Sequence, residues 1–261
     1  MRQFVLPSQY DGSGFLSVTG DEYHYLSRVL RLQEGDSFPA IDHSGERYTL
    51  TIIEKENGKC TVSVHPEGPQ RAVREETGHR SPNPRITLFQ CIPKGKKMDL
   101  IIRQAAEAGV RSLYPVVSEH TVPKIQAENR SSKQERWERI VEEAVQQSGS
   151  STITGIHGPI GLGDIPRVWN CTEQRLGLIF HEKLLEKKSL HDYLSDSPDE
   201  IGIVIGPEGG LSSKEVDLLT GSGFNLVYLG NNVLRTETAS LYAVAAVTIT
   251  YRERSSWKLR R

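Results

Sequence analysis

From residue 85 onward, short apolar segments alternate with longer amphipathic ones. The apolar segments are RITLFQCI (85–92), SLYPVVS (112–118), TITGI (152–156), RLGLIF (175–180), IGIVIG (201–206) and FNLVYLG (224–230). This alternation predicts an α/β domain whose mostly parallel sheet is covered by helices on both faces. Ligands of such sheets bind beyond the carboxyl ends of the strands. The loops that follow the strands are therefore the first place to look for a site.

The amphipathic segments predict the covering helices. Residues 96–110 carry an inward face of Met98, Ile101, Ile102, Ala105, Ala106 and Ala108. Residues 132–149 carry one of Trp137, Ile140, Val141, Ala144 and Val145, and end at Gly149. Further helices are expected over 212–223, where Ser212 and Glu215 fit a capping box, and over 237–254.

The first 68 residues are typical of a small β-barrel or sandwich. Alternating segments between residues 38 and 66 are separated by turn signals, the strongest being Asn57-Gly58. A short helix is expected over Asp21 to Leu32, with Asp21 as a possible cap. Residues 69–84 are rich in Gly, Pro and charge without periodicity, which is typical of a linker. We therefore predict domains at 1–68 and 85–261.

Composition excludes several classes of protein. A formal net charge of -1 argues against a protein that wraps nucleic acid nonspecifically. The 3 cysteines are far apart without a CxxC pair, and the His residues show no ligand spacing, so we expect neither a disulfide framework nor a metal site. We find no signal-peptide or membrane-span pattern, so we expect a cytoplasmic protein without membrane contact.

The loop GPEGG, residues 206–210, follows one of the predicted strands. It lacks the Lys-Ser/Thr of a phosphate-binding P-loop and the G-x-G-x-x-G of a dinucleotide loop. Its three glycines let backbone groups approach a flat, polar ligand, Pro207 stiffens it, and Glu208 adds a carboxylate. The alternative is a tight turn that is glycine-rich without binding anything.

A second loop, LGNNVLRTETAS (229–240), follows the next strand along the chain. It turns at Gly230 and presents Arg235, Thr236, Glu237 and Thr238 at the start of an apolar helix. Such a helix N-terminus favours an anionic or carbonyl-bearing group. A Thr N-cap with an Arg-Glu surface pair is the alternative. Two such loops on successive strands favour a shared pocket.

Together these segments resemble the RsmE-type RNA methyltransferases of the SPOUT superfamily, which methylate N3 of a uridine in small-subunit (16S) ribosomal RNA with S-adenosylmethionine. The resemblance rests on HYLSRVLRLQEGD (24–36), KGKKMDLIIRQAAEAGV (94–110), PVVSEHTV (115–122), RWERIVEEAVQQSG (136–149), IGPEGGLSSKEV (205–216) and LGNNVLRTETAS (229–240). It implies a PUA-like RNA-binding barrel, a C-terminal trefoil knot whose loops hold the cofactor, and a homodimer acting on ribosomal RNA. The near-neutral charge favours an assembled subunit over free RNA as the substrate.

The resemblance also implies the site. Arg235 is the candidate that stabilises the uracil anion, and Glu208 and Glu237 compete as base or orienting group. The cofactor is expected to contact Ile205, Gly206, Pro207, Glu208, Gly209, Gly210, Leu229, Gly230, Val233, Leu234, Thr236, Thr238 and Ala239, with Leu211 as a further apolar wall.

Two stretches depart from the family pattern. Asn231-Asn232 stands where Pro-Arg is expected, and SGSSTIT (148–154) has Ser150 where Arg is expected and Thr154 near an expected Pro. Two alternatives therefore stay open: an RNA-binding or ribosome-assembly factor without catalysis, and a methyltransferase acting on transfer RNA or a ribose hydroxyl.

Overall fold

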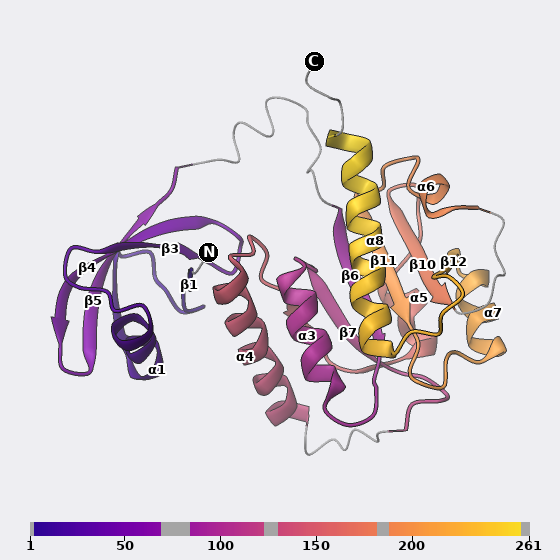
Figure 1. The fold of residues 1–261 in the computed structure, drawn as a ribbon, viewed down its shortest axis with the longest axis horizontal. Helices are drawn as coiled ribbons and strands as arrows, with labels where there is room; N and C mark the ends of the chain where they lie inside the picture. The colour runs from indigo at the N-terminus through magenta and orange to yellow at the C-terminus, as the bar shows by residue number, and fades with distance from the viewer. Residues whose placement is uncertain (1–2, 69–83, 123–129, 182–187, 257–261) are drawn as a thin grey trace. The chain divides into compact units, whose positions relative to one another are not determined.

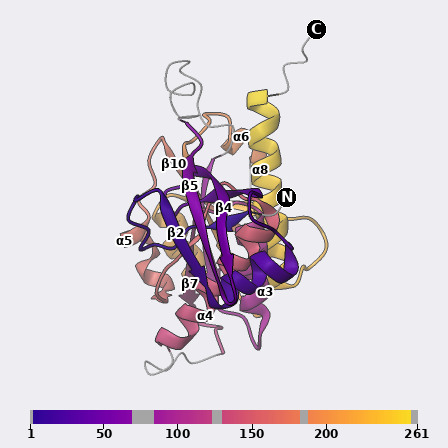
Figure 2. The same ribbon diagram turned by 90° about the vertical axis from the view of Figure 1, so that its left-hand side faces the viewer.

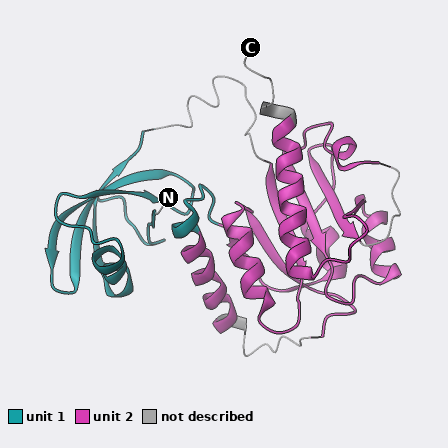
Figure 3. Cartoon of the chain, in the orientation of Figure 1, with its two compact units in different colours: residues 1–78, 145–153 teal, residues 79–144, 154–261 magenta. Residues whose placement is uncertain are grey.

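The computed structural model describes residues 3–68, 84–122, 130–181 and 188–256. The chain forms two compact units, residues 1–78 with 145–153 and residues 79–144 with 154–261 (Figures 1 and 3). All of the predicted linker except Pro84 lies outside the described residues. The domain boundaries therefore stay a prediction.

The first unit is built on a curled five-stranded sheet in the order β1-β3-β4-β5-β2. Its strands are β1 (Phe4–Val5), β2 (Phe15–Thr19), β3 (Ser37–Ile41), β4 (Arg47–Glu56) and β5 (Lys59–Pro66). In Figure 2, β2, β5 and β4 lie side by side. Gly58 adopts a φ of 87° between β4 and β5, which confirms the predicted hairpin turn. A bulge between Ile52 and Glu54 increases the local twist of the sheet.

The helix of the first unit is shorter than predicted. It consists of α1 (Gly20–His24) and a π-helical turn (Tyr25–Val29). The chain leaves the helix before Leu32 because Arg31 takes a left-handed conformation, with a φ of 56°. The prediction that Asp21 is the cap was wrong: Thr19 holds the N-cap position and Asp21 lies within the first turn.

Residues 145–153, which include the last turn of the helix α4 (Arg130–Ser148), belong to the first unit although the rest of that helix belongs to the second. The Gln3 side chain holds them, because its Nε2 donates to the carbonyl oxygen of Ser150 at 2.7 Å. The backbone N–H of Gln3 also donates to the carbonyl oxygen of Gln146 at 3.0 Å. No periodicity in the sequence signals this contact.

The second unit contains a seven-stranded sheet in the order β12-β10-β11-β6-β7-β8, with β9 also paired to β7. Its strands are β6 (Arg85–Cys91), β7 (Ser112–Val117), β8 (Gly155–Ile156), β9 (Ile160–Gly161), β10 (Arg175–His181), β11 (Glu200–Ile205) and β12 (Phe224–Tyr228). Every pairing among the described strands of this sheet is parallel. This confirms the predicted parallel sheet, while the trefoil knot stays a prediction.

Helices cover both faces of this sheet, as predicted. They are α3 (Lys97–Glu107), α4 (Arg130–Ser148), the 3-10 turn η3 (Leu162–Asp164), α5 (Ile165–Val168), α6 (Leu190–Tyr193), α7 (Ser213–Gly221) and α8 (Thr236–Ser256). The helices α3 and α8 lie in front of the sheet in Figure 1. Leu88 of β6 faces them, beside Ile101 of α3 and Val244 of α8. The next residue, Phe89, points to the opposite face, where it packs with the apolar residues of α5 and α7.

The predicted inward faces are largely confirmed. The named residues of the first two helices are buried except Ala108, which forms the exposed C-cap of α3. Gly149 ends α4 with a φ of 70°. In the described part of the chain, every helix is too short or too polar to span a membrane.

Strand order brings the two glycine loops together. The loop 206–210 follows β11 and the loop 229–235 follows β12, and β10 lies between these two strands. Because all three strands run parallel, their carboxyl ends meet at one edge of the sheet. The two loops and the end of β10 therefore surround a common space.

Candidate active site

A cavity of about 430 Å³ opens at this edge of the sheet. Three segments line it: the end of β10, the loop after β11, and the loop after β12 with the first residues of α8. The lining residues are Phe180, His181, Ile205, Gly206, Pro207, Glu208, Gly209, Gly210, Leu211, Leu229, Asn232, Val233, Leu234, Arg235, Thr236 and Ala239.

Most of the predicted site residues lie in this cavity. Thirteen of them line it: Ile205, Gly206, Pro207, Glu208, Gly209, Gly210, Leu211, Leu229, Val233, Leu234, Arg235, Thr236 and Ala239. Three others do not line it. Gly230 forms the turn after β12, Thr238 is exposed on α8, and Glu237 contacts Lys97 beside the cavity. Whether these residues hold a cofactor stays a prediction.

Glycines let the backbone of the first loop line the cavity. A Cβ on Gly206 would lie 3.3 Å from the carbonyl carbon of Gly210, which is too close without movement of the backbone. Gly210 has a φ of 68°, and its N–H donates to the carbonyl oxygen of Pro207 at 2.9 Å to close a tight turn. Side chains at Gly206 and Gly210 would therefore disturb the loop.

The second loop turns at Gly230, whose φ is 107°. The following Asn231 accepts a hydrogen bond from the Tyr228 hydroxyl at 2.8 Å, so a polar contact fixes the turn where the family pattern has proline. Val233 is 78% exposed although it lines the cavity. This apolar side chain is available to cover a bound ligand.

A buried polar network joins the two loops. Thr236 Oγ1 donates to the carbonyl oxygen of Gly206 at 2.9 Å and accepts from Gln90 Nε2 at 3.1 Å. Ser240 Oγ contacts both Gln90 Oε1 and the carbonyl oxygen of Thr236. Gln90, Thr236 and Ser240 are 0%, 4% and 3% exposed, so these bonds form away from water, where a lost partner is costly.

Lys97 joins the two predicted catalytic glutamates. Its Nζ lies 2.9 Å from Glu208 Oε1 and 3.5 Å from Glu237 Oε2. The Glu208 carboxylate also accepts from the backbone N–H of Lys94 at 3.1 Å. Lys97 thus holds both carboxylates at the start of α3.

The pKa values follow from these contacts. Burial acts to raise the pKa of Glu208, but the hydrogen bonds from Lys97 and from backbone N–H groups outweigh it, so the pKa lies below its usual range. The bond to Glu208 raises the pKa of Lys97. Glu208 is therefore ionised at neutral pH and is a weak proton acceptor.

Sequence reasoning missed four residues of this region. Phe180 and His181 line the cavity because β10 lies between β11 and β12, an order that the sequence does not state. Gln90 had a signal, since it is a polar residue between the apolar Phe89 and Cys91 near the end of a strand segment. Lys97 had none that distinguishes it from neighbouring lysines.

The sequence matches the family model "RNA methyltransferase domain" over residues 79–248, which include both glycine loops. The chain belongs to this family of RNA methyltransferases. Residues 18–64 match a second model, "RNA methyltransferase PUA domain", which confirms the PUA-like identity predicted for the N-terminal part.

Two relatives are named as ribosomal RNA methyltransferases. The chain is 32% identical to ribosomal RNA small subunit methyltransferase E of Synechocystis over 89% of this chain and 72% of the relative. It is also 32% identical to the protein of that name from Aquifex aeolicus, over 87% of this chain and 90% of the relative. Both relatives confirm the RsmE-type resemblance.

A solved structure has the same fold. Ribosomal RNA small subunit methyltransferase E from Neisseria gonorrhoeae, bound to S-adenosyl methionine, superposes with a TM-score of 0.77. The two chains are 28% identical, and the match covers 94% of this chain and 96% of the other. The similarity therefore extends over almost the whole chain.

Proposed function

We propose that this RNA methyltransferase transfers a methyl group from S-adenosylmethionine to N3 of a specific uridine in small-subunit ribosomal RNA. The names of the relatives support ribosomal RNA as the substrate class, and the resemblance of the two loop motifs supports N3. The observation that carries the proposal is the cavity between loops 206–210 and 229–235. We place the reaction in the cytoplasm, where ribosomal subunits are assembled.

The residues of the cavity fit the cofactor. Because Gly206, Gly209 and Gly210 have no side chains, their backbone N–H and C=O groups line the cavity and can meet the adenine and ribose edges. Side chains at Gly206 and Gly210 would disturb that loop. Ile205, Leu211 and Leu229 supply apolar walls. When bound, S-adenosylmethionine supplies an electrophilic methyl group on a sulfonium. Because the methyl is already activated, the protein has no need of a covalent nucleophile.

Arg235 is our candidate for electrostatic catalysis. Its side chain lines the cavity at the N-terminus of α8, where the helix dipole also favours negative charge. Uracil N3–H is a weakly acidic imide between two carbonyls. A guanidinium near one carbonyl oxygen stabilises the anion that forms when N3 loses its proton.

The two glutamates have different roles in this proposal. Glu208 is bound by Lys97 and by a backbone N–H, and its lowered pKa makes it a weak base. We therefore assign Glu208 to orienting the loop and Lys97. Glu237, whose contact with Lys97 is the longer one, is the better candidate for accepting the N3 proton.

Nucleoside mass spectrometry tests the function. Ribosomal RNA from cells that lack the gene should lose one N3-methyluridine, and purified protein with S-adenosylmethionine should restore it in small subunits from those cells. Methylation of transfer RNA or of a ribose hydroxyl would contradict the assignment. Unchanged RNA from the deletion strain, together with binding of subunits, would favour a factor without catalysis.

We also propose that the protein acts as a homodimer on an assembled subunit. The near-neutral formal charge of -1 suits a folded particle better than free RNA, because binding of extended RNA relies on phosphate neutralisation. Light scattering at assay concentration should give twice the chain mass of 29.2 kDa. A single-chain mass would contradict the dimer.

A further inference from the structure

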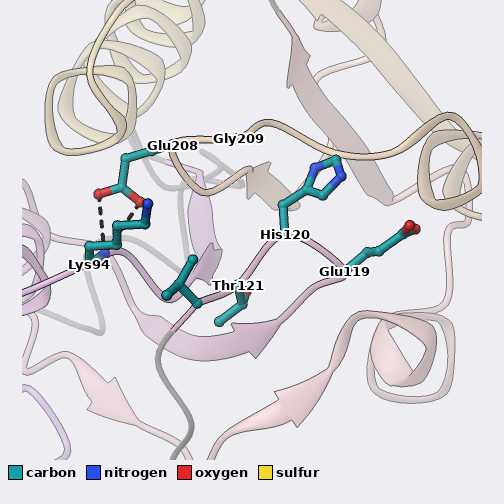
Figure 4. Close-up of a pocket in the computed structure, with 7 residues that line it drawn as sticks. Lys94, Glu119, His120, Thr121, Glu208 and Gly209 are labelled. Carbon is teal, nitrogen blue, oxygen red and sulfur yellow. Dashed lines mark hydrogen bonds between the residues drawn. The ribbon is translucent and has the colours of Figure 1, made fainter.

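A second pocket of about 460 Å³ lies beside the first cavity. Its lining consists of Lys94, Glu119, His120, Thr121, Val122, Glu208 and Gly209 (Figure 4). Glu208 and Gly209 also line the first cavity, so the two spaces share part of one loop. A ligand in the second pocket would therefore lie next to a cofactor in the first.

The floor of the second pocket is a preformed turn after β7. The backbone N–H of Ser118 donates to Thr121 Oγ1 at 2.9 Å, and the N–H of Thr121 donates to the carbonyl oxygen of Ser118 at 3.0 Å. The N–H of Glu119 donates to Glu215 Oε1 at 2.8 Å. Glu215 also closes the capping box of α7 with Ser212, as the sequence predicted. These bonds hold the turn without a ligand, which lowers the entropic cost of binding one.

His120 presents a hydrogen-bond acceptor to this pocket. Its imidazole rises toward the loop of Glu208 and Gly209 in Figure 4, and Nδ1 lies 3.1 Å from the carbonyl oxygen of Gly210. A carbonyl oxygen only accepts, so Nδ1 carries the hydrogen. In the neutral ring, Nε2 then keeps its lone pair and accepts hydrogen bonds.

His120 packs closely against Gly209, where only a residue without a side chain fits. A Cβ at Gly209 would lie 3.1 Å from the Cβ of His120. A side chain there would push the histidine and the loop apart. The glycine therefore serves the second pocket as well as the first cavity.

The charged side chains of the pocket are Lys94, Glu119 and Glu208, and the Glu119 carboxylate points away from Lys94 in Figure 4. Lys94 is exposed at the rim and offers an ammonium group that suits a phosphate. The negative charge of Glu208 is compensated by Lys97 at 2.9 Å. The hydroxyl of Thr121, which its bonds to Ser118 fix in place, gives the floor a further polar group. An acceptor at His120 suits a base N–H or a ribose hydroxyl, the groups by which unpaired RNA is recognised.

We propose that the second pocket receives the unpaired nucleotide that is methylated, with Lys94 on its phosphate and His120 Nε2 accepting a hydrogen bond from its base or ribose. This inference rests on the proposed function, because it needs RNA beside the methyl donor. It identifies the turn 118–121 as part of the substrate site. In this role Lys94 and His120 bind substrate and leave the cofactor contacts unchanged.

Three variants separate substrate contact from loop support. His120→Asn keeps an amide N–H at about the position of Nδ1, so it retains the bond to Gly210, and it removes Nε2. Lys94→Ala removes the ammonium group and keeps the backbone N–H that Glu208 accepts. Arg103→Ala, at an exposed position of α3, is the control for loss of one positive charge.

The experiment measures affinity and kinetics side by side. Cosedimentation with small subunits from a strain that lacks the gene gives Kd without catalysis, tritiated methyl transfer gives KM and kcat, and calorimetry gives the affinity for S-adenosylmethionine. We expect His120→Asn and Lys94→Ala each to raise Kd and KM for the subunits about tenfold, a change of about 1.4 kcal/mol. Cofactor affinity of all variants, and every value for Arg103→Ala, should stay within about twofold of wild type.

Two results would overturn the inference. One is wild-type Kd and KM in both His120→Asn and Lys94→Ala. The other is an equal loss of cofactor affinity, which would mean that these residues act only through the shared loop. If the wild-type protein binds the subunits and transfers no methyl to them, the proposed function fails, while cosedimentation of the variants still tests the pocket.

Discussion

Thr236 Oγ1 donates a hydrogen bond to the carbonyl oxygen of Gly206, and this 2.9 Å contact ties the start of α8 to the glycine loop after β11. The two residues are 30 positions apart in the chain. Their bond fixes the relative position of the two loops that form the cavity. Two buried side chains support it, Gln90 of β6 and Ser240 of α8.

Breaking this contact should weaken cofactor binding. Thr236→Val keeps the shape of the side chain but leaves the Gly206 carbonyl without this donor and removes one of the two acceptors of Gln90 Nε2, which keeps its bond to the Cys91 carbonyl, at a cost of about 1–3 kcal/mol. We expect the Kd for S-adenosylmethionine to rise about tenfold or more by calorimetry. Thr236→Ser, which keeps the hydroxyl, should bind almost normally. Equal affinity of Val and Ser variants would show that the bond is irrelevant to the cavity.

Adding side chains to the glycine loop 206–210 should abolish cofactor binding. Replacing both Gly209 and Gly210 by Val forces a clash with His120 and a strained left-handed β-branched residue. Calorimetry should then detect no binding. Gly158→Val is the control, because a Cβ at Gly158 meets nothing within 4 Å and the backbone there is unstrained. Binding of wild-type strength by the double variant would remove this loop from the cofactor site.

Removing the guanidinium should affect turnover more than binding. Arg235→Ala should leave the cofactor Kd within about twofold of wild type and lower kcat about 10²–10³-fold, the usual loss when one group that stabilises a developing anion is removed. Single-turnover methyl transfer at saturating cofactor measures this. A kcat equal to that of wild type would contradict a catalytic role for Arg235.

Lys97 should determine the pH below which the site loses the stability that the Glu208 ion pair contributes. Glu208 has a lowered pKa, so the stability that its ion pair contributes is present above the ordinary value of 4.5 and is lost only as pH falls through the lowered one. In Lys97→Met the pKa of Glu208 should rise, and the loss should begin at a higher pH. Lys97→Arg should restore the wild-type profile.

Calorimetric titrations with S-adenosylmethionine between about pH 4 and 8 measure this profile. Near pH 7 the Met variant should also bind more weakly, since Glu208 and Glu237 then lie beside each other without the cation that joins them. Identical pH profiles for wild type and Lys97→Met would show that the ion pair has no influence on the cavity.

Local patterns predicted most of the fold of the second unit. Apolar runs such as 201–205 and 85–91 form buried parallel strands, and Ser212 with Glu215 makes the expected capping box. These features depend on neighbours within a few residues, so the sequence states them directly. The predicted cap Asp21 failed because the extended backbone at Thr19, two residues earlier, decides where α1 begins.

By itself the sequence determined the two glycine loops, the helix that begins at Thr236 and the residues that line most of the cavity. Only the tertiary structure decided that β10 separates the two loop-bearing strands, and therefore that Phe180 and His181 reach the cavity. It also decided that Lys97 meets Glu208 and that His120 meets Gly210. The physical reason is that strand order and side-chain contacts across more than 80 positions depend on how the whole chain packs, and no local periodicity records them.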